Sequence, residues 1–133
     1  MKDISELNPH GYETSEVIDR HLRMTFERVM ELQGAYLEEH PDEPGFQINS
    51  GLRSDEHQQR LIAAGKTNAV HSKHLAGLAV DINDPEGKIG KWALENAGVL
   101  ARIGLWAEHP KHTKNWLHVQ SSPPKSGKRF FIP

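Results

Sequence analysis

Two short segments constrain the fold of this chain most, because each sets one polar side chain between two apolar ones. Residues 78–82 are rich in β-branched types and carry Asp81, and residues 116–120 carry His118. Successive side chains of a strand point to opposite faces, so the apolar neighbours face a core and the polar residue faces away from it. If the two strands are neighbours, Asp81 and His118 share one face. The flanking apolar residues are Val80, Ile82, Leu117 and Val119.

Helical and strand patterns alternate along the rest of the chain. A helix that begins at Thr14 or Ser15 should end near Leu37, because the prolines of residues 40–45 cannot continue it. Further patterns predict a strand at 46–48, a helix capped by Ser54 or Asp55, a helix over 89–103 that stops at Gly104, and a strand at 105–107. These elements predict an α+β fold with about three helices and a small, mostly antiparallel sheet of four strands.

The length and composition indicate one domain, 1–133, with residues 121–133 as a docked C-terminal tail rather than a new element. The net charge of −2 does not indicate a nucleic-acid partner, and no apolar run is long enough for a membrane span or a secretory signal. We therefore expect synthesis in the cytoplasm, and most simply a monomer. The chain has no cysteine but nine histidines, so a metal would be held by histidine and carboxylate ligands.

Three of these potential ligands can converge. Gly77 breaks any helix between His74 and Asp81, and His74 leads into the strand of Asp81 from a turn, so it can reach the face shared with His118. Two imidazoles and one carboxylate would form a three-ligand site with an open fourth position, which is the arrangement of catalytic zinc sites. The spacing alone also fits ordinary hydrogen-bonded histidines.

The order of these residues resembles the M15 family of zinc peptidases, which cut peptidoglycan stem peptides. The pattern S-x-H-x-x-G-x-A-x-D covers residues 72–81, W-x-H covers 116–118, and S-G-L-R-S covers 50–54. The sequence is most similar to short phage and prophage members. The resemblance implies the hedgehog/DD-peptidase-like fold, carboxypeptidase or endopeptidase activity next to D-amino acids, and Zn²⁺ held by His74, Asp81 and His118. Such a protein would reach the cell wall after lysis or within a phage particle.

One position departs from the family pattern. Many members carry an acidic general base three residues before the last histidine, and this chain has Asn115 there. A neutral amide cannot take up a proton. The nearest acidic candidate is Glu108, at the end of the strand predicted at 105–107, and His109 and His112 are weaker alternatives.

Two further residues are candidates for substrate binding. Arg53 follows a short strand, and its guanidinium could hold a substrate carboxylate or a developing oxyanion. Ser72 could donate to the substrate or cap the turn that orients His74. His57 and His71 are assigned no role.

Two other functions use the same residues. Without a base at position 115, the chain could be a non-catalytic metal-containing module that holds cell-wall peptides in a phage structural assembly. Two histidines and a carboxylate also form the triad of non-haem iron oxygenases. That fold needs about eight barrel strands, and the four strands expected here do not supply them.

Overall fold

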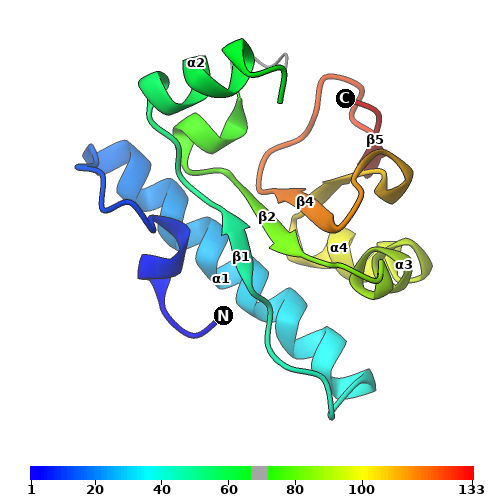
Figure 1. Ribbon diagram of the computed structural model, residues 1–133. Coiled ribbons are helices and arrows are strands. Elements are labelled where there is room, and N and C mark those ends of the chain that lie inside the picture. Colours follow the sequence, from blue (N-terminus) through cyan, green and yellow to red (C-terminus); the bar gives the residue numbers. More distant parts are fainter. Residues whose placement is uncertain (67–71) are drawn as a thin grey trace.

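Five strands form one sheet in the order β1-β2-β4-β3-β5 (Figure 1). The computed structural model describes residues 1–66 and 72–133. His71 therefore lies outside the described residues. Adjacent strands are antiparallel except for β3 and β5, which are parallel, so the predicted α+β fold with a mostly antiparallel sheet is confirmed. The strands are β1 (Ile48–Ser50), β2 (Ala79–Asn83), β3 (Trp106–Glu108), β4 (Trp116–Gln120) and β5 (Phe130–Phe131).

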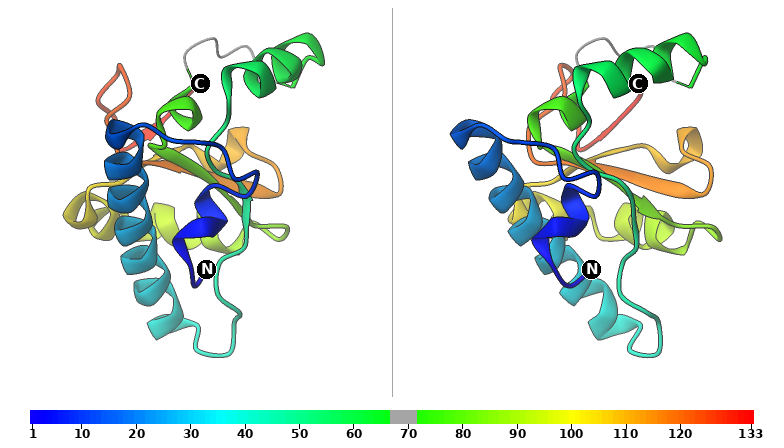
Figure 2. Two further views of the ribbon diagram at one scale, coloured as in Figure 1. Left: turned by 90° about the vertical axis from the view of Figure 1, so that its left-hand side faces the viewer. Right: turned by 60° about the vertical axis from the view of Figure 1, so that its left-hand side comes forward.

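Three helices, α1, α3 and α4, contribute buried residues to the apolar core against this sheet. The long helix α1 passes behind the sheet in Figure 1 and stays on one side of it in both views of Figure 2. Buried residues of α1, α3, β2 and β4 belong to one apolar cluster. The helices are α1 (Glu16–Glu39), α2 (Asp55–Ala63), α3 (Lys88–Glu95) and α4 (Ala97–Ile103), with short 3-10 turns η1 (Ile4–Leu7), η2 (Lys73–Ala76) and η3 (Pro110–His112).

The helix ends follow local chemistry. Ser15 caps α1 by accepting from the Ile18 amide, and α1 extends two residues beyond the predicted Leu37. Ser54, one of the two predicted caps, caps α2 by accepting from the His57 amide. No helix among the described residues is long and apolar enough to cross a membrane.

The prediction of one helix over 89–103 is wrong, because the chain breaks at Asn96 into α3 and α4. Asn96 has φ −125° and its side-chain amide donates to the Trp92 carbonyl, which takes the place of a helical hydrogen bond. The apolar positions continue at helical spacing across this break. The pattern therefore did not reveal the break.

The prediction that the tail forms no new element is also wrong. Phe130 and Phe131 pair with Ala107 and Glu108 and add β5 to the sheet edge. Two residues are too few to show an alternating pattern, and their partners lie over 20 positions away in the sequence. The strands predicted at 46–48, 78–82 and 105–107 each lie one or two residues further along the chain than expected.

Candidate metal centre

Asp81 and His118 lie directly opposite each other in the antiparallel β2–β4 pair, so the two strands are neighbours, which was the condition for the predicted shared face. Their strand neighbours are fully buried on the other face: Val80, Ile82, Leu117 and Val119. Paired residues of adjacent strands project from the same face, and here His118 Nδ1 lies 2.9 Å from Asp81 Oδ1. The alternation read from the sequence thus sets the first two groups of the site.

His74 completes the group from the turn η2. Ser72 caps this turn, with its Oγ accepting from the His74 amide at 3.2 Å, and Gly77 ends it in the left-handed conformation at φ 74°. His74 is 2% exposed, and its Nε2 lies 3.3 Å from Asp81 Oδ1. The three candidate ligand atoms all lie within 4.8 Å of one another. His74, Asp81 and His118 could therefore hold a metal ion.

The hydrogen bonds around the two imidazoles show what kind of ligand the group fits. The Gly51 carbonyl can only accept, so His74 Nδ1 donates to it at 2.8 Å and the lone pair of Nε2 faces Asp81. His118 Nε2 lies 2.9 Å from Gln120 Oε1, which leaves its Nδ1 toward the same carboxylate oxygen. Two nitrogen lone pairs and one carboxylate oxygen repel one another unless a cation or a proton lies among them.

One of the two imidazole separations from Asp81 Oδ1 matches that of two zinc ligands. Two ligands of a tetrahedral zinc with bonds of about 2.1 Å lie about 3.4 Å apart, and His74 Nε2 lies 3.3 Å from Asp81 Oδ1, whereas His118 Nδ1 lies at the hydrogen-bond distance of 2.9 Å. Each imidazole also has its second nitrogen bound to an oxygen, as ligating histidines in metal proteins have. The donor set therefore fits a divalent ion that accepts nitrogen and oxygen ligands.

Charge at the site is balanced around Asp81. Burial opposes ionisation of this carboxyl, but the charge and hydrogen bond that His74 and His118 supply when they are protonated hold its pKa well below the usual range. Burial lowers the pKa of His74. Burial also opposes protonation of His118, but the hydrogen bond and charge of Asp81 outweigh it and raise the pKa of His118. Without a metal, a proton on His118 can thus fill the place among the acceptors.

Arg53 lies behind Asp81 rather than open to solvent. Its Nη2 is 3.4 Å from Asp81 Oδ2, its Nε donates to Ser50 Oγ at 3.1 Å, and its Nη1 donates to Gln58 Oε1 at 3.1 Å. The side chain is 13% exposed. Arg53 therefore holds the carboxylate oxygen that faces away from the histidines, whereas its predicted contact with substrate stays a prediction.

Glu108 lies on the same face as the three ligands. Ala107 pairs with Val119 in the last pair of the β3–β4 ladder, and continuing this register by one residue brings Glu108 toward His118. Glu108 also pairs with Phe131 of β5, whose ring lies 6.0 Å from the His118 ring. Burial raises the pKa of Glu108, and the charge of His118 partly offsets this effect. A half-buried carboxyl group thus lies beside the candidate ligands.

Asn115 is not part of the group formed by the three candidate ligands and Glu108. It is exposed, its backbone is left-handed at φ 77°, and its carbonyl accepts from the Asp84 amide. Asparagine and aspartate adopt this conformation more readily than other residues with a side chain, so the turn explains the residue type at 115. The alternative bases His109 and His112 lie in the adjoining loop with ring centroids 6.4 Å apart.

Sequence reasoning missed two groups that hold the histidines. Gln120 is on the same strand face as His118, two residues on, and this spacing was the available signal. The Gly51 carbonyl leaves no signal, because any residue has a backbone oxygen.

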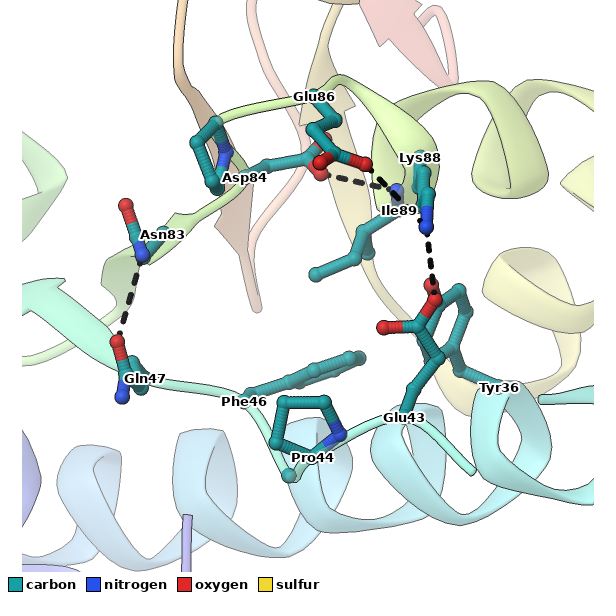
Figure 3. A pocket seen from close by; sticks show the side chains of 12 residues that line it. Tyr36, Glu43, Pro44, Phe46, Gln47, Asn83, Asp84, Glu86, Lys88 and Ile89 are labelled. Carbon is teal, nitrogen blue, oxygen red and sulfur yellow. Dashed lines mark hydrogen bonds and ion pairs between the residues drawn. The ribbon is translucent and has the colours of Figure 1, made fainter. Parts of the chain in front are cut away.

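A separate cavity of about 250 Å³ lies between the C-terminal end of α1 and the turn after β2 (Figure 3). Its charged groups are already paired. Lys88 Nζ lies 3.1 Å from Glu43 and 3.2 Å from Glu86, and Asp84 accepts from two amides of the first turn of α3. Among residues 1–66 and 72–133, the His74–Asp81–His118 group is the one set with metal-ligand geometry.

No family model and no curated protein matches the chain. Among solved structures, it is similar to the crystal structure of the Serratia marcescens L-Ala D-Glu endopeptidase ChiX, with 24% sequence identity and a TM-score of 0.49 over 91% of this chain and 94% of that chain. The assignment of the metal centre rests on the donor atoms of this chain.

Proposed function

We propose that this protein is a zinc-dependent peptidase that hydrolyses peptidoglycan stem-peptide amides next to D-amino acids. The observation that carries the proposal is the convergence of two imidazole lone pairs and the Asp81 carboxylate on one point, beside the half-buried Glu108. The motif resemblance described above supports the substrate class. Both carboxypeptidase and endopeptidase activity are compatible with this arrangement.

Zinc is the metal that we propose for this group. Two histidine nitrogens and one carboxylate oxygen are a common ligand set of catalytic zinc, and three protein ligands leave a position for water or substrate. A zinc ion held by His74, Asp81 and His118 would polarise a carbonyl oxygen and acidify a water molecule.

Glu108 is the residue that we assign to proton transfer. A general base has to lie within hydrogen-bond reach of the attacking water, and the assignment is supported by the β3–β4 register, which continues from Ala107–Val119 toward Glu108 and His118. The pKa of Glu108 is raised, so it lies closer to neutral pH than the pKa of an ordinary glutamate. A carboxylate with such a pKa can take a proton from water and then pass it to the leaving amine.

Arg53 and Ser72 are the proposed substrate-binding residues, and both also support the ligands. Arg53 has further N–H groups beyond the three that bind Ser50, Gln58 and Asp81, and a carboxylate or oxyanion next to Asp81 could accept from them. The Ser72 hydroxyl accepts from the His74 amide and keeps its own proton for donation.

The experiment that tests the proposal uses zinc-loaded protein and defined muropeptides. Mass spectrometry of the products should reveal hydrolysis, with release of a terminal D-amino acid indicating a carboxypeptidase and an internal cut indicating an endopeptidase. The Asp81→Ala variant is the control, since it should give no product. Binding of muropeptides without any product would instead favour the alternative, a metal-containing binding module of a phage assembly.

A further inference from the structure

We infer that Gln120 is a positioning residue that fixes which nitrogen of His118 faces the metal. Gln120 is not one of the three candidate ligands, and its contact with them is through the His118 ring. The inference rests on the proposed metal centre, but its readouts are proton position and zinc affinity rather than turnover.

A chain of two contacts, from Ser122 to Gln120 and from Gln120 to His118, sets the orientation of the ring. The Ser122 carbonyl can only accept, so the group of Gln120 that lies 2.9 Å from it must be the amide Nε2. The amide oxygen Oε1 therefore points the other way, 2.9 Å from His118 Nε2. Because Oε1 can only accept, this contact is a hydrogen bond only when His118 Nε2 carries a hydrogen, and a neutral His118 in that tautomer keeps the lone pair on Nδ1.

The main chain that holds Gln120 is itself fixed. Gln120 is 4% exposed, and the next residue, Ser121, is bound on three sides. Its amide donates to Leu78, its hydroxyl donates to Thr25, and its carbonyl accepts from Arg28 at 2.9 Å. Two residues of α1 thus anchor the segment that presents the Gln120 amide, so this side chain has little freedom to turn away from His118.

Gln120 matters because Asp81 favours the opposite tautomer. Asp81 Oδ1 lies 2.9 Å from His118 Nδ1, and a carboxylate attracts a hydrogen to the nitrogen that faces it. Without Gln120, a neutral His118 would carry its proton on Nδ1, between itself and Asp81, where it would block metal binding. The Gly51 carbonyl has the corresponding role for His74, because it accepts from Nδ1 and leaves the lone pair on Nε2.

The tautomer of His118 can be read directly by long-range ¹H–¹⁵N NMR of zinc-free protein, at a pH above the pKa of the ring. The wild type should carry the proton on Nε2. Gln120→Met keeps the side-chain length but removes the acceptor, so the proton should move toward Nδ1. In zinc competition assays this variant should bind roughly 10 to 100 times more weakly, which is the usual effect of losing such a partner.

Two variants separate this role from a general packing effect. Gln120→Glu keeps an acceptor oxygen, and it should retain the Nε2 proton and bind zinc more tightly than Gln120→Met. Gln47→Met is the matched control, because Gln47 is exposed and its side chain pairs with Asn83 at the end of β2 rather than with a candidate ligand.

Two results would overturn the inference: a wild-type His118 with its proton on Nδ1, or a folded Gln120→Met protein with wild-type zinc affinity. If Gln120→Met does not fold, the wild-type tautomer and the Gln120→Glu affinity still decide. Failure of zinc to bind the wild type at all would count against the proposed function, whereas the tautomer in zinc-free protein would still test the inference.

Discussion

Asp81 and His118 face each other across the β2–β4 ladder with 2.9 Å between carboxylate oxygen and Nδ1, and the second oxygen of the same carboxylate faces Arg53. The two oxygens of Asp81 thus have different partners. Oδ1 is part of the candidate ligand group, and Oδ2 faces the positively charged Arg53, which stabilises the carboxylate. Loss of a ligand and loss of its support should therefore have separable effects.

The ligand variants His118→Ala and Asp81→Ala should lose most bound zinc. Wild-type protein loaded with zinc and desalted should retain about one ion per chain, measured by elemental analysis. Because the raised pKa of His118 lets protons compete with the metal, zinc affinity should begin to fall at a higher pH than for an ordinary histidine ligand. His10→Ala, which removes an exposed histidine outside the group, is the control. Undiminished zinc in His74→Ala, Asp81→Ala and His118→Ala alike would refute the site.

Replacing Arg53, which binds the outer oxygen of Asp81, should weaken zinc binding without abolishing it. Arg53→Ala leaves Oδ2 of a largely buried carboxylate without its charged partner, and loss of such outer contacts typically costs about tenfold or more in metal affinity. Hydrolysis should fall further than zinc occupancy if Arg53 also binds substrate, and isothermal titration with parallel kinetics measures both. Arg60→Ala is the control, because the ion pair of Arg60 with Glu56 is exposed. Equal activity of Arg53→Ala and wild type at full zinc occupancy would exclude the substrate role.

The sequence was sufficient to predict that Asp81 and His118 each point away from the core, because strict alternation of apolar and polar positions is a local property of each strand. That they share one face followed only if the two strands are neighbours, which the β2–β4 pairing confirms. His74 was also found, because Gly77 fixes the turn just before β2. The sequence could not supply the register that places Glu108 beside His118, since pairing between distant strands depends on the whole sheet. The contacts that orient the imidazoles were hidden as well, because one is a backbone oxygen and the other depends on Ser122 beyond the end of β4.

Gly51 should tolerate no larger residue. A Cβ at this position would lie 2.3 Å from the Leu7 carbonyl oxygen, so Gly51→Ala must push β1 away from η1. This shift would move the carbonyl that anchors His74, and overpacking of this kind typically costs about 1–3 kcal/mol of unfolding free energy. Denaturant unfolding and zinc affinity should both report the loss. Gly34→Ala is the control, since nothing lies within 4 Å of its Cβ and alanine in the middle of α1 should stabilise by about 0.5–1 kcal/mol.

Glu108→Gln should keep the fold and the zinc but remove the proposed base, lowering kcat by roughly 10² to 10⁴. In the wild type, burial raises the pKa of Glu108, so the active carboxylate is lost as pH falls through that raised pKa. In the pH profile of kcat/KM, the midpoint of the acid limb should therefore lie above the pKa of an ordinary glutamate. This midpoint reports the titration of Glu108. Glu38→Gln, on the exposed side of α1, should change neither kcat nor the acid limb of the pH profile. An equally active Glu108→Gln enzyme would mean that His109 or His112 supplies the base, and asparagine at each position would identify which.

Asn115→Asp tests whether the position three residues before His118 can carry the base in this fold. The left-handed φ of 77° suits aspartate nearly as well as asparagine, so the variant should unfold at the same denaturant concentration as the wild type. If Glu108 is the base, the added carboxylate should leave the activity of the parent enzyme within the same order of magnitude and should partly restore the Glu108→Gln variant. If the wild type only binds muropeptides, Asn115→Asp should be the variant in which weak hydrolysis first appears, because it alone supplies a proton acceptor that the parent lacks. Measuring wild type, both single variants and the double variant on one muropeptide separates these cases. If the wild type hydrolyses the muropeptide but the double variant is as inactive as Glu108→Gln, residue 115 cannot reach the attacking water.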